Sequence, residues 1–166
     1  LYHCSQPTIS RAINTIINTL NTLLPPAPTP EELDPRLYCV LDGTLVPCYS
    51  WHNAPELYNA KRKTTGHNLQ ILTDQTGNIT YISHPFSGKT HDVTALRATG
   101  ILDTISPDHI TADKGYYGVG CDVPIKKKPG QKHLKDYQRR FNHKLGKIRY
   151  VIERAIANLK TWRILH

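Results

Sequence analysis

The chain has 166 residues and a formal net charge of +8, with 21 lysines and arginines against 13 aspartates and glutamates. This length allows one core of ordinary size and a small appendage, and the charge favours an anionic partner. No apolar run is long enough to span a membrane and no signal peptide is recognisable, so we expect neither a membrane protein nor a secreted one.

The first segment, residues 1–24, has the pattern of one amphipathic helix over about 5–24. Ser5 is a good N-cap, Pro7 is tolerated in the first turn, and apolar residues recur at helical spacing. These residues are Ile9, Ile13, Ile16, Ile17, Leu20 and Leu24. Short polar residues and Arg11 at the helix start suit a partial helix-turn-helix that binds DNA. The alternative is a helix that packs on the main domain, and the sequence leaves both open.

A proline-rich stretch separates this helix from the rest of the chain. The four prolines of residues 25–30 end the helix and form a stiff, extended spacer. Three acidic residues follow, in a pattern that fits a short helix before Pro35. We place a linker at residues 25–36 and the main domain at residues 37–166.

The main domain begins with an apolar run that predicts a central strand. Residues 37–46 contain a single charged residue, Asp42, and such runs are typical of strands covered on both faces. A buried aspartate without a partner is strongly unfavourable, so Asp42 must have one. Gly43 permits the close approach of another backbone or of a ligand. Cys39 and Cys48, which flank Asp42, are interpreted as small buried residues.

The remaining pattern predicts an α/β fold, with a mixed sheet of about five strands and flanking helices. A hairpin is followed by a short helix, two short strands and a long C-terminal helix. The expected ranges are 68–74, 79–83, 91–100, 109–112, 122–125 and 132–162, with a loop at 47–66. Thr90 or Asp92 is expected to cap the helix at 91–100, which Gly100 ends.

Positive charge is concentrated in the last third of the chain. From Lys114 onward there are 14 basic residues against three acidic ones. Such one-sided charge favours a nucleic acid over a small acidic metabolite. The runs at 61–63 and 126–128 are interpreted as solvated loops that contact phosphates when DNA is bound. The four cysteines show no C-x-x-C or zinc-ligand spacing, so we expect a reducing, cytoplasmic compartment.

Three carboxylates are candidates for a metal site. Asp42 and Asp113 lie at expected strand ends, and Glu153 shares one face of the long helix with Arg149 and Lys160. If the two strands lie side by side, their aspartates meet and the helix can supply the glutamate. Carboxylates gathered in this way bind Mg²⁺ or Mn²⁺. Two such ions ~3.5–4 Å apart can hold a phosphodiester during an in-line displacement.

Each acid also has an ordinary explanation. Glu153 alone suits a solvated ion pair, and Asp113 alone suits the start of a turn. Asp92 competes for the place of the second acid, but its position at a helix start favours capping over metal binding. Tyr116 and Tyr117 are expected to pack in the core rather than to stack on a base.

The order of the motifs resembles the DDE transposases of bacterial insertion sequences, within the branch of DDE superfamily endonucleases that includes the Harbinger elements. The motifs are Asp-Gly-Thr at 42–44, Ser-Gly-x-x-His-Asp at 87–92, Ala-Asp-Lys-Gly-Tyr at 112–116 and Arg-x-x-x-Glu-x-x-x-x-x-x-Lys at 149–160. The second acid and the glutamate are separated by 39 residues. The resemblance covers residues 37–165, and the tyrosine common three residues before the arginine is Gly146 here.

The resemblance implies an RNase H-like domain that cuts and joins transposon ends with divalent metal, Mg²⁺ or Mn²⁺, as two ions. It implies a catalytic and metal-binding triad of Asp42, Asp113 and Glu153. The contacts to DNA expected from charge and resemblance together are Arg11, Lys114, Lys126, Lys127, Lys128, Arg149 and Lys160. Double-stranded DNA is the implied partner, bound by a homodimer or higher oligomer near the nucleoid of a bacterial cell. Residues 5–11 resemble the second helix of the helix-turn-helix that precedes this domain in the family.

Two other functions remain open. One is a catalytically inactive or domesticated transposase remnant that binds DNA through its basic helix. The other is a basic RNA-associated protein without an active site, which predicts that the three acids lie scattered.

Overall fold

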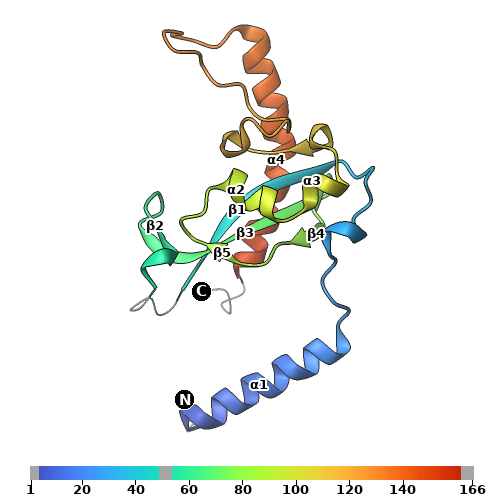
Figure 1. Ribbon diagram of the computed structural model, residues 1–166, viewed down its shortest axis with the longest axis vertical. Helices are drawn as coiled ribbons and strands as arrows, with labels where there is room; N and C mark the ends of the chain where they lie inside the picture. Colours follow the sequence, from blue (N-terminus) through green and yellow to red (C-terminus); the bar gives the residue numbers. More distant parts are fainter. Residues whose placement is uncertain (1–3, 49–53, 162–166) are drawn as a thin grey trace.

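The computed structural model describes residues 4–48 and 54–161 (Figure 1). The helices are α1 Gln6–Leu23, α2 Asp92–Ala98, α3 Ile101–Thr104 and α4 Asp136–Thr161. The strands are β1 Cys39–Pro47, β2 Tyr58–Asn59, β3 Thr64–Asp74, β4 Ile79–Ile82, β5 Phe86–Ser87 and β6 Ile110–Thr111. The first and last predicted helices are confirmed, although α4 starts four residues later than expected. The expected helix end at residue 162 lies outside the described residues.

Among the described residues, six strands form one mixed sheet in the order β2-β3-β1-β6, and β4 and β5 pair with other parts of β3. β1 and β3 form a long antiparallel pair, from Cys39 opposite Asp74 to Pro47 opposite Gly66. β6 pairs with β1 in parallel. The predicted mixed α/β sheet is confirmed with one more strand than expected, and the arrangement is consistent with an RNase H-like fold.

Helices cover both faces of the sheet (Figure 1). Because side chains alternate along a strand, Leu41 of β1 packs with Leu96 of α2, whereas Val40 packs with Ile152 of α4 on the other face. All four side chains are fully buried, and burying each one stabilises the fold by roughly 1.5–3 kcal/mol. β1 is therefore the central strand that was predicted, and Cys39 within it is buried as expected.

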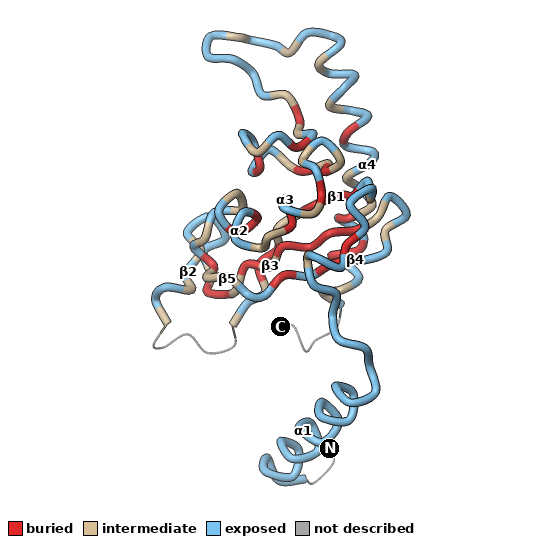
Figure 2. The backbone as a smooth tube through the Cα atoms, turned by 45° about the vertical axis from the view of Figure 1, so that its right-hand side comes forward, coloured by how far each residue is buried: buried red, intermediate tan, exposed pale blue. Residues whose placement is uncertain are grey.

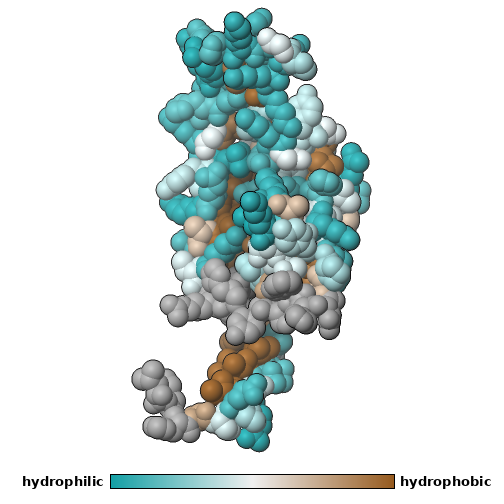
Figure 3. Space-filling view, turned by 90° about the vertical axis from the view of Figure 1, so that its left-hand side faces the viewer, coloured by the Kyte–Doolittle hydropathy of each residue, from teal (hydrophilic) through white to brown (hydrophobic). Residues whose placement is uncertain are grey.

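α1 stands apart from the sheet domain (Figure 2). None of its residues is buried, and its apolar stripe faces solvent, as the brown band on the lower helix in Figure 3 shows. The exposed apolar residues are Ile9, Ile13, Ile16, Ile17, Leu20 and Leu23. The helix thus adds nothing to the core of the sheet domain. No helix in the described part of the chain combines the length and apolarity needed to cross a membrane.

The expected edge strand at 122–125 does not form, and only an isolated bridge to Thr111 remains there. Pro124 has no N–H to donate to a neighbouring strand. Asn142 of α4 takes both backbone groups of Ile125, accepting from its N–H at 2.8 Å and donating to its carbonyl oxygen at 3.1 Å. A side chain therefore replaces the strand partner.

β3 is longer than predicted and takes up the end of the expected loop at 47–66. It begins at Thr64 and pairs there with β2. The predicted strand began at residue 68, so residues 64–67 are the part that was missed, and they include the buried polar residue Thr65 and the buried Gly66. A buried polar residue beside a glycine breaks the alternation that identifies a strand in a sequence.

Candidate functional site

Two predicted site residues, Asp42 and Asp113, lie at corresponding positions in the register of two neighbouring strands. In the parallel pair, Cys39 of β1 is opposite Ile110 of β6, and Asp42 and Asp113 each follow three residues later. Neighbouring strands are ~4.8 Å apart, so both carboxylates reach the same edge of the sheet. The expectation that these two strands lie side by side is confirmed.

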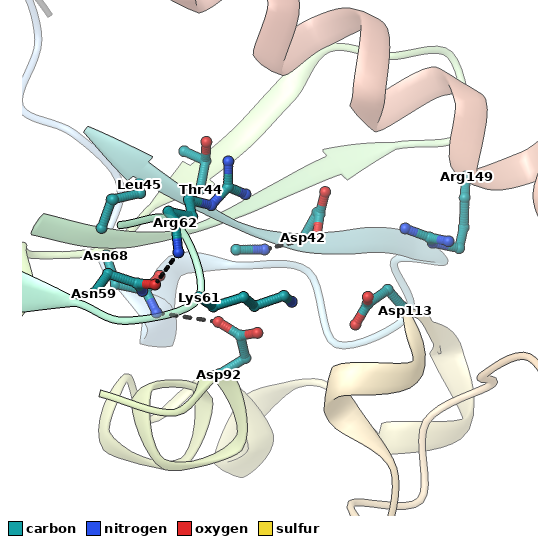
Figure 4. A pocket seen from close by; sticks show the side chains of 11 residues that line it. Asp42, Thr44, Leu45, Asn59, Lys61, Arg62, Asn68, Asp92, Asp113 and Arg149 are labelled. Atoms are coloured by element: carbon teal, nitrogen blue, oxygen red, sulfur yellow. Dashed lines mark hydrogen bonds between the residues drawn. The ribbon is translucent and has the colours of Figure 1, made fainter. Parts of the chain in front are cut away.

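A cavity of about 200 Å³, here called the carboxylate pocket, opens beside the middle of β1 and just after the end of β6 (Figure 4). Asp42 is the fourth of the nine residues of β1, so the expectation that it lies at a strand end is wrong. The lining residues of the pocket are Asp42, Gly43, Thr44, Leu45, Asn59, Lys61, Arg62, Asn68, Asp92, Asp113 and Arg149. Three aspartates and three basic residues from five separate parts of the chain thus meet in one place. An RNA-associated protein without a site predicted scattered acids, and this expectation is wrong for Asp42 and Asp113.

Asp42 is partly buried beside one cation and two other acids. Its Oδ1 accepts a hydrogen bond of 2.9 Å from the N–H of Gly43. Burial raises the pKa of the Asp42 carboxyl to about 6, while Arg149 opposes this rise and Asp113 and Asp92 add to it. A further positive charge in the pocket would favour the ionised carboxylate. The electrostatics of Asp42 therefore favour the binding of a cation.

Asp113 both starts a turn and lines the pocket. Its carboxylate accepts a hydrogen bond from the N–H of Gly115 and caps the short 3-10 helix Lys114–Tyr116. The ordinary explanation from the sequence is therefore confirmed. The same side chain points into the carboxylate pocket toward Asp42 (Figure 4), so the turn orients the carboxylate.

Asp92 does not cap α2, contrary to the role that its position favoured. The N-cap residue is His91, and no side chain caps this helix. Asp92 Oδ1 instead accepts a hydrogen bond of 3.0 Å from Nδ2 of Asn68, whose Oδ1 accepts one of 3.1 Å from Nε2 of Gln70. Gln70 Oε1 accepts a bond of 2.7 Å from the hydroxyl of Tyr116. This polar chain ties Asp92 to Tyr116 of the Asp-Lys-Gly-Tyr motif, which is fully buried as predicted. The same prediction is wrong for Tyr117, which is exposed.

Two glycines of the motifs allow the acids to come together. A Cβ on Gly43 would lie 2.7 Å from Oδ1 of Asp92 and 3.0 Å from the hydroxyl of Tyr116. A Cβ on Gly115 would lie 2.7 Å from Oδ1 of Asp113 and 3.1 Å from Oδ2 of Asp92. These separations are shorter than ordinary contacts, so a side chain at either position would displace these side-chain oxygens. A close approach of a backbone or a ligand was expected at Gly43, and the groups that approach it are side chains.

Glu153 lies outside the lining of the pocket, one helical turn from Arg149. Its side chain is 56% exposed, and its Oε1 is 3.8 Å from Nη2 of Arg149. Arg149 lines the pocket, is 18% exposed and has a buried Nε without a hydrogen-bond partner. The structure thus gathers Asp42, Asp92 and Asp113 around one pocket and leaves Glu153 in contact with Arg149. Within the described ranges, no group of three or more histidine, cysteine or acidic side chains is arranged to hold a metal ion.

The residues predicted to bind DNA fall in different places. Arg149 lines the pocket. Lys160 lies close enough to the pocket to interact with two of its charged residues. Burial and Arg62 lower the pKa of Lys160, while Asp42 raises it. The others are exposed and are not part of the lining, namely Arg11, Lys114, Lys126, Lys127 and Lys128.

Sequence reasoning missed four lining residues on the β2–β3 hairpin, which are Asn59, Lys61, Arg62 and Asn68. The basic run at 61–63 was interpreted as a solvated loop that contacts phosphates when DNA is bound, and not as part of the site lining. Recognising the β2–β3 hairpin would have placed these residues, because the pairing of β2 with β3 brings the turn between them next to β1. A two-residue strand has no periodicity by which to detect it.

Comparison with known proteins adds independent information on this region. A model of the DDE superfamily endonucleases matches residues 41–166. A protein named as a transposase for insertion sequence element IS112, from Streptomyces albus G, is 31% identical over 126 residues, which cover 76% of this chain and 48% of that protein. A protein named as a transposase for insertion sequence element IS702, from Microchaete diplosiphon, is 30% identical over 100 residues, which cover 57% of this chain and 35% of that protein.

No solved structure matches the chain. The chain spans about half the length of the first of these relatives and less of the second. The narrower Harbinger-like branch stays a prediction. The region matched by the family holds every residue that lines the carboxylate pocket and the whole of α4, and the chain belongs to the DDE superfamily endonucleases.

Proposed function

We propose that this chain is the catalytic part of an insertion-sequence transposase, which cleaves phosphodiester bonds at transposon ends and joins them to target DNA with the help of divalent metal ions. The observation that carries this proposal is the common level of Asp42 and Asp113 in one pocket with Arg149. Paired carboxylates suit metal-assisted phosphoryl transfer, and a guanidinium suits a phosphate. The names of the two relatives support the same activity.

The carboxylates of Asp42 and Asp113 would hold Mg²⁺ or Mn²⁺, because both ions prefer hard oxygen ligands. The oxygen ligands of the pocket fit such an ion, since burial disfavours the ionised form of Asp42 and a bound cation would stabilise it. The third ligand proposed from the resemblance is Glu153, whose long and exposed contact with Arg149 is weak and easily exchanged. Asp92 is its rival. Two bound ions would supply activation of the attacking hydroxyl and stabilisation of the leaving oxygen.

The basic residues of the pocket would bind the DNA backbone. Arg149 offers a buried Nε that has no protein partner, and a phosphate oxygen is a suitable acceptor for it. Lys160 adds positive charge beside the pocket. The proposed partner is the double-stranded DNA of the transposon ends and target, held by a homodimer or higher oligomer in the bacterial cytoplasm.

Nicking of a supercoiled plasmid in the presence of Mn²⁺ tests this function. The unmodified chain is expected to convert supercoiled DNA into the nicked form, and EDTA is expected to stop the reaction. Asp42→Ala and Asp113→Ala should each reduce the rate by about a thousandfold or more. Asp103→Asn, which changes an exposed acid of α3 outside the pocket, serves as the control and should nick normally.

A second pair of variants identifies the third carboxylate. Loss of nicking in Glu153→Gln, with activity kept in Asp92→Asn, would establish the triad expected from the resemblance. The opposite result would assign the role to Asp92. Binding of duplex DNA without any nicking by the unmodified chain would instead support an inactive transposase remnant that acts as a DNA-binding module.

A further inference from the structure

The turn between β2 and β3 carries two cations into the carboxylate pocket. Residues 60–63 form this turn, and Lys63 closes it with a φ of 51°, a left-handed conformation that residues other than glycine rarely adopt. Lys61 and Arg62 line the pocket, whereas Lys63 does not. In Figure 4, Lys61 extends into the space among the three aspartates and Arg62 lies beside Thr44.

Asn59 holds the turn by one hydrogen bond inside it and one to the segment at Gly88. Its Oδ1 accepts a hydrogen bond of 2.9 Å from the N–H of Arg62, and its Nδ2 donates one of 2.6 Å to the carbonyl oxygen of Gly88. Beside it, the hydroxyl of Ser87 donates to the carbonyl oxygen of Glu56, just before the hairpin. The turn is therefore fastened to the segment that begins the Ser-Gly-x-x-His-Asp motif.

Only glycine fits at position 88. A Cβ there would collide with the carbonyl oxygens of Leu57 and Gly66. Both obstacles are backbone atoms, which cannot rotate away as a side chain can. The motif at 87–92 thus joins two parts of the pocket, because its first residues fasten the basic turn and its last residue is Asp92.

Within the described residues, these two cations are not engaged in ion pairs. The side chains of Lys61 and Arg62 are both exposed. Arg149 enters from α4, at the other end of the pocket in Figure 4. A phosphodiester that approaches three carboxylates is repelled unless positive charges lie within reach. The pocket offers such charges at both of its ends.

We propose that Lys61 and Arg62 form a phosphate clamp with Arg149, and that Asn59 positions this clamp. The ligand is a DNA phosphodiester in the pocket, whose nonbridging oxygens accept hydrogen bonds from the ammonium and guanidinium groups. Asn59 is a positioning residue because it holds the turn. The inference rests on the proposed nuclease function of the same pocket and assigns two residues of the basic run to the site itself.

Three matched variants test the clamp, because Lys61→Gln, Arg62→Gln and Lys63→Gln each remove one charge from the same turn. The first two are expected to slow Mn²⁺-dependent nicking at saturating plasmid by about tenfold or more. In binding assays with a short fluorescent DNA duplex, they should lower the slope of log affinity against log salt by about 0.9. Lys63→Gln should leave both quantities within about twofold of the unmodified chain. Equal effects at all three positions would overturn the clamp.

Asn59→Ala removes no charge and tests the positioning role. It is expected to slow nicking about as much as Lys61→Gln, and the double variant should be no slower than Lys61→Gln alone. Urea unfolding of each variant reports any loss of stability separately. Additive losses in the double variant would overturn the positioning role, because they would show that Asn59 acts independently of the clamp.

The clamp and the proposed function fail in different ways. If the unmodified chain nicks DNA and Asp42→Ala does not, while Lys61→Gln and Arg62→Gln behave as Lys63→Gln does, the function stands and the clamp is wrong. If the unmodified chain does not nick DNA, the proposed function is wrong, and the salt dependence of duplex binding by the three variants still decides the clamp.

Discussion

The carboxylate pocket and the outer end of α4 organise charge in opposite ways. The outer end, here called the basic arm, consists of residues 123–148, the loop and the first half of α4 at the top of Figure 1. In the pocket, charged groups have defined neighbours, as when Asp92 bonds to Asn68 and Asp42 to the backbone of Gly43. In the arm, cations project into solvent. We therefore expect the positions of single atoms to matter in the first region and the summed charge to matter in the second.

Within the basic arm, nine lysines and arginines accompany a single acid, Asp136, which pairs with Arg139. The basic residues are Lys126, Lys127, Lys128, Lys132, Lys135, Arg139, Arg140, Lys144 and Lys147. Only Pro124 and Leu145 are buried in this fully described segment. The arm therefore has almost no core of its own, and its charges are replaceable one by one.

A pair of glycine substitutions gives the sharpest contrast between the two regions. Gly43→Ala would force Asp92 and Tyr116 out of place, and a displacement of this size should lower the nicking rate by about a hundredfold. Gly146→Ala in the arm meets no atom within 4 Å, so nicking should be unchanged and the helix should gain up to about 1 kcal/mol. Plasmid nicking and urea unfolding measure both. Similar nicking rates in the two variants would contradict the comparison.

The charge of Asp42 should destabilise the metal-free fold. Because its pKa is raised to about 6, the folded chain loses stability as the pH rises from about 4 to 6 and does not regain it above that range. Asp42→Asn removes this cost and is expected to raise the free energy of unfolding at pH 8 by about 2–3 kcal/mol. Urea titrations without metal at pH 8 and pH 4 provide the test, and the gain should vanish at pH 4. An equal gain at both pH values would show another cause.

The basic arm should respond to the number of charges removed. Glutamine at Arg139, Arg140, Lys144 and Lys147 together is expected to weaken duplex binding by about tenfold or more, while each single change has an effect of about threefold or less. Nicking at saturating DNA should remain, since none of these residues lines the pocket. Fluorescence anisotropy over a range of salt concentrations measures the loss. If one substitution alone reproduced the whole loss, the arm would contain a specific site after all.

The smallest effect is expected for the stability of Glu153→Gln. The contact between Glu153 and Arg149 is 3.8 Å long and the carboxylate is 56% exposed, and such pairs contribute less than about 1 kcal/mol. Urea unfolding should therefore show almost no change, whatever happens to nicking. A clear loss of stability would mean that Glu153 has a structural role.

Local patterns in the sequence were sufficient for the parts of the fold with strong periodicity. β1 was predictable because apolar residues dominate the run at 37–46, and this run made the single charge of Asp42 stand out. The common level of Asp42 and Asp113 followed once the two strands were placed side by side. The long helices were equally clear, but the pattern of α1 did not reveal that its apolar stripe would face solvent.

The rest depends on contacts between distant residues that leave no local pattern. Asn68 lies 24 residues before Asp92 and takes its carboxylate away from a capping role. Asn59 reaches Gly88 across 29 residues, and this bond sets the direction of a turn that resembles an ordinary solvated loop in the sequence. Asn142 similarly replaces an expected strand. In all three cases the local structure depends on a hydrogen bond of an asparagine side chain, and the tertiary structure determines its partner.

The continuity of α4 has a geometric consequence. The helix runs without a break from Asp136 to Thr161, so Arg140 and Arg149 are about 14 Å apart along its axis at ~1.5 Å per residue. A duplex lying along the helix covers that length in about four base pairs. The helix would then fix the distance along a bound duplex between the phosphates near Arg140 and the phosphodiester that lies in the carboxylate pocket.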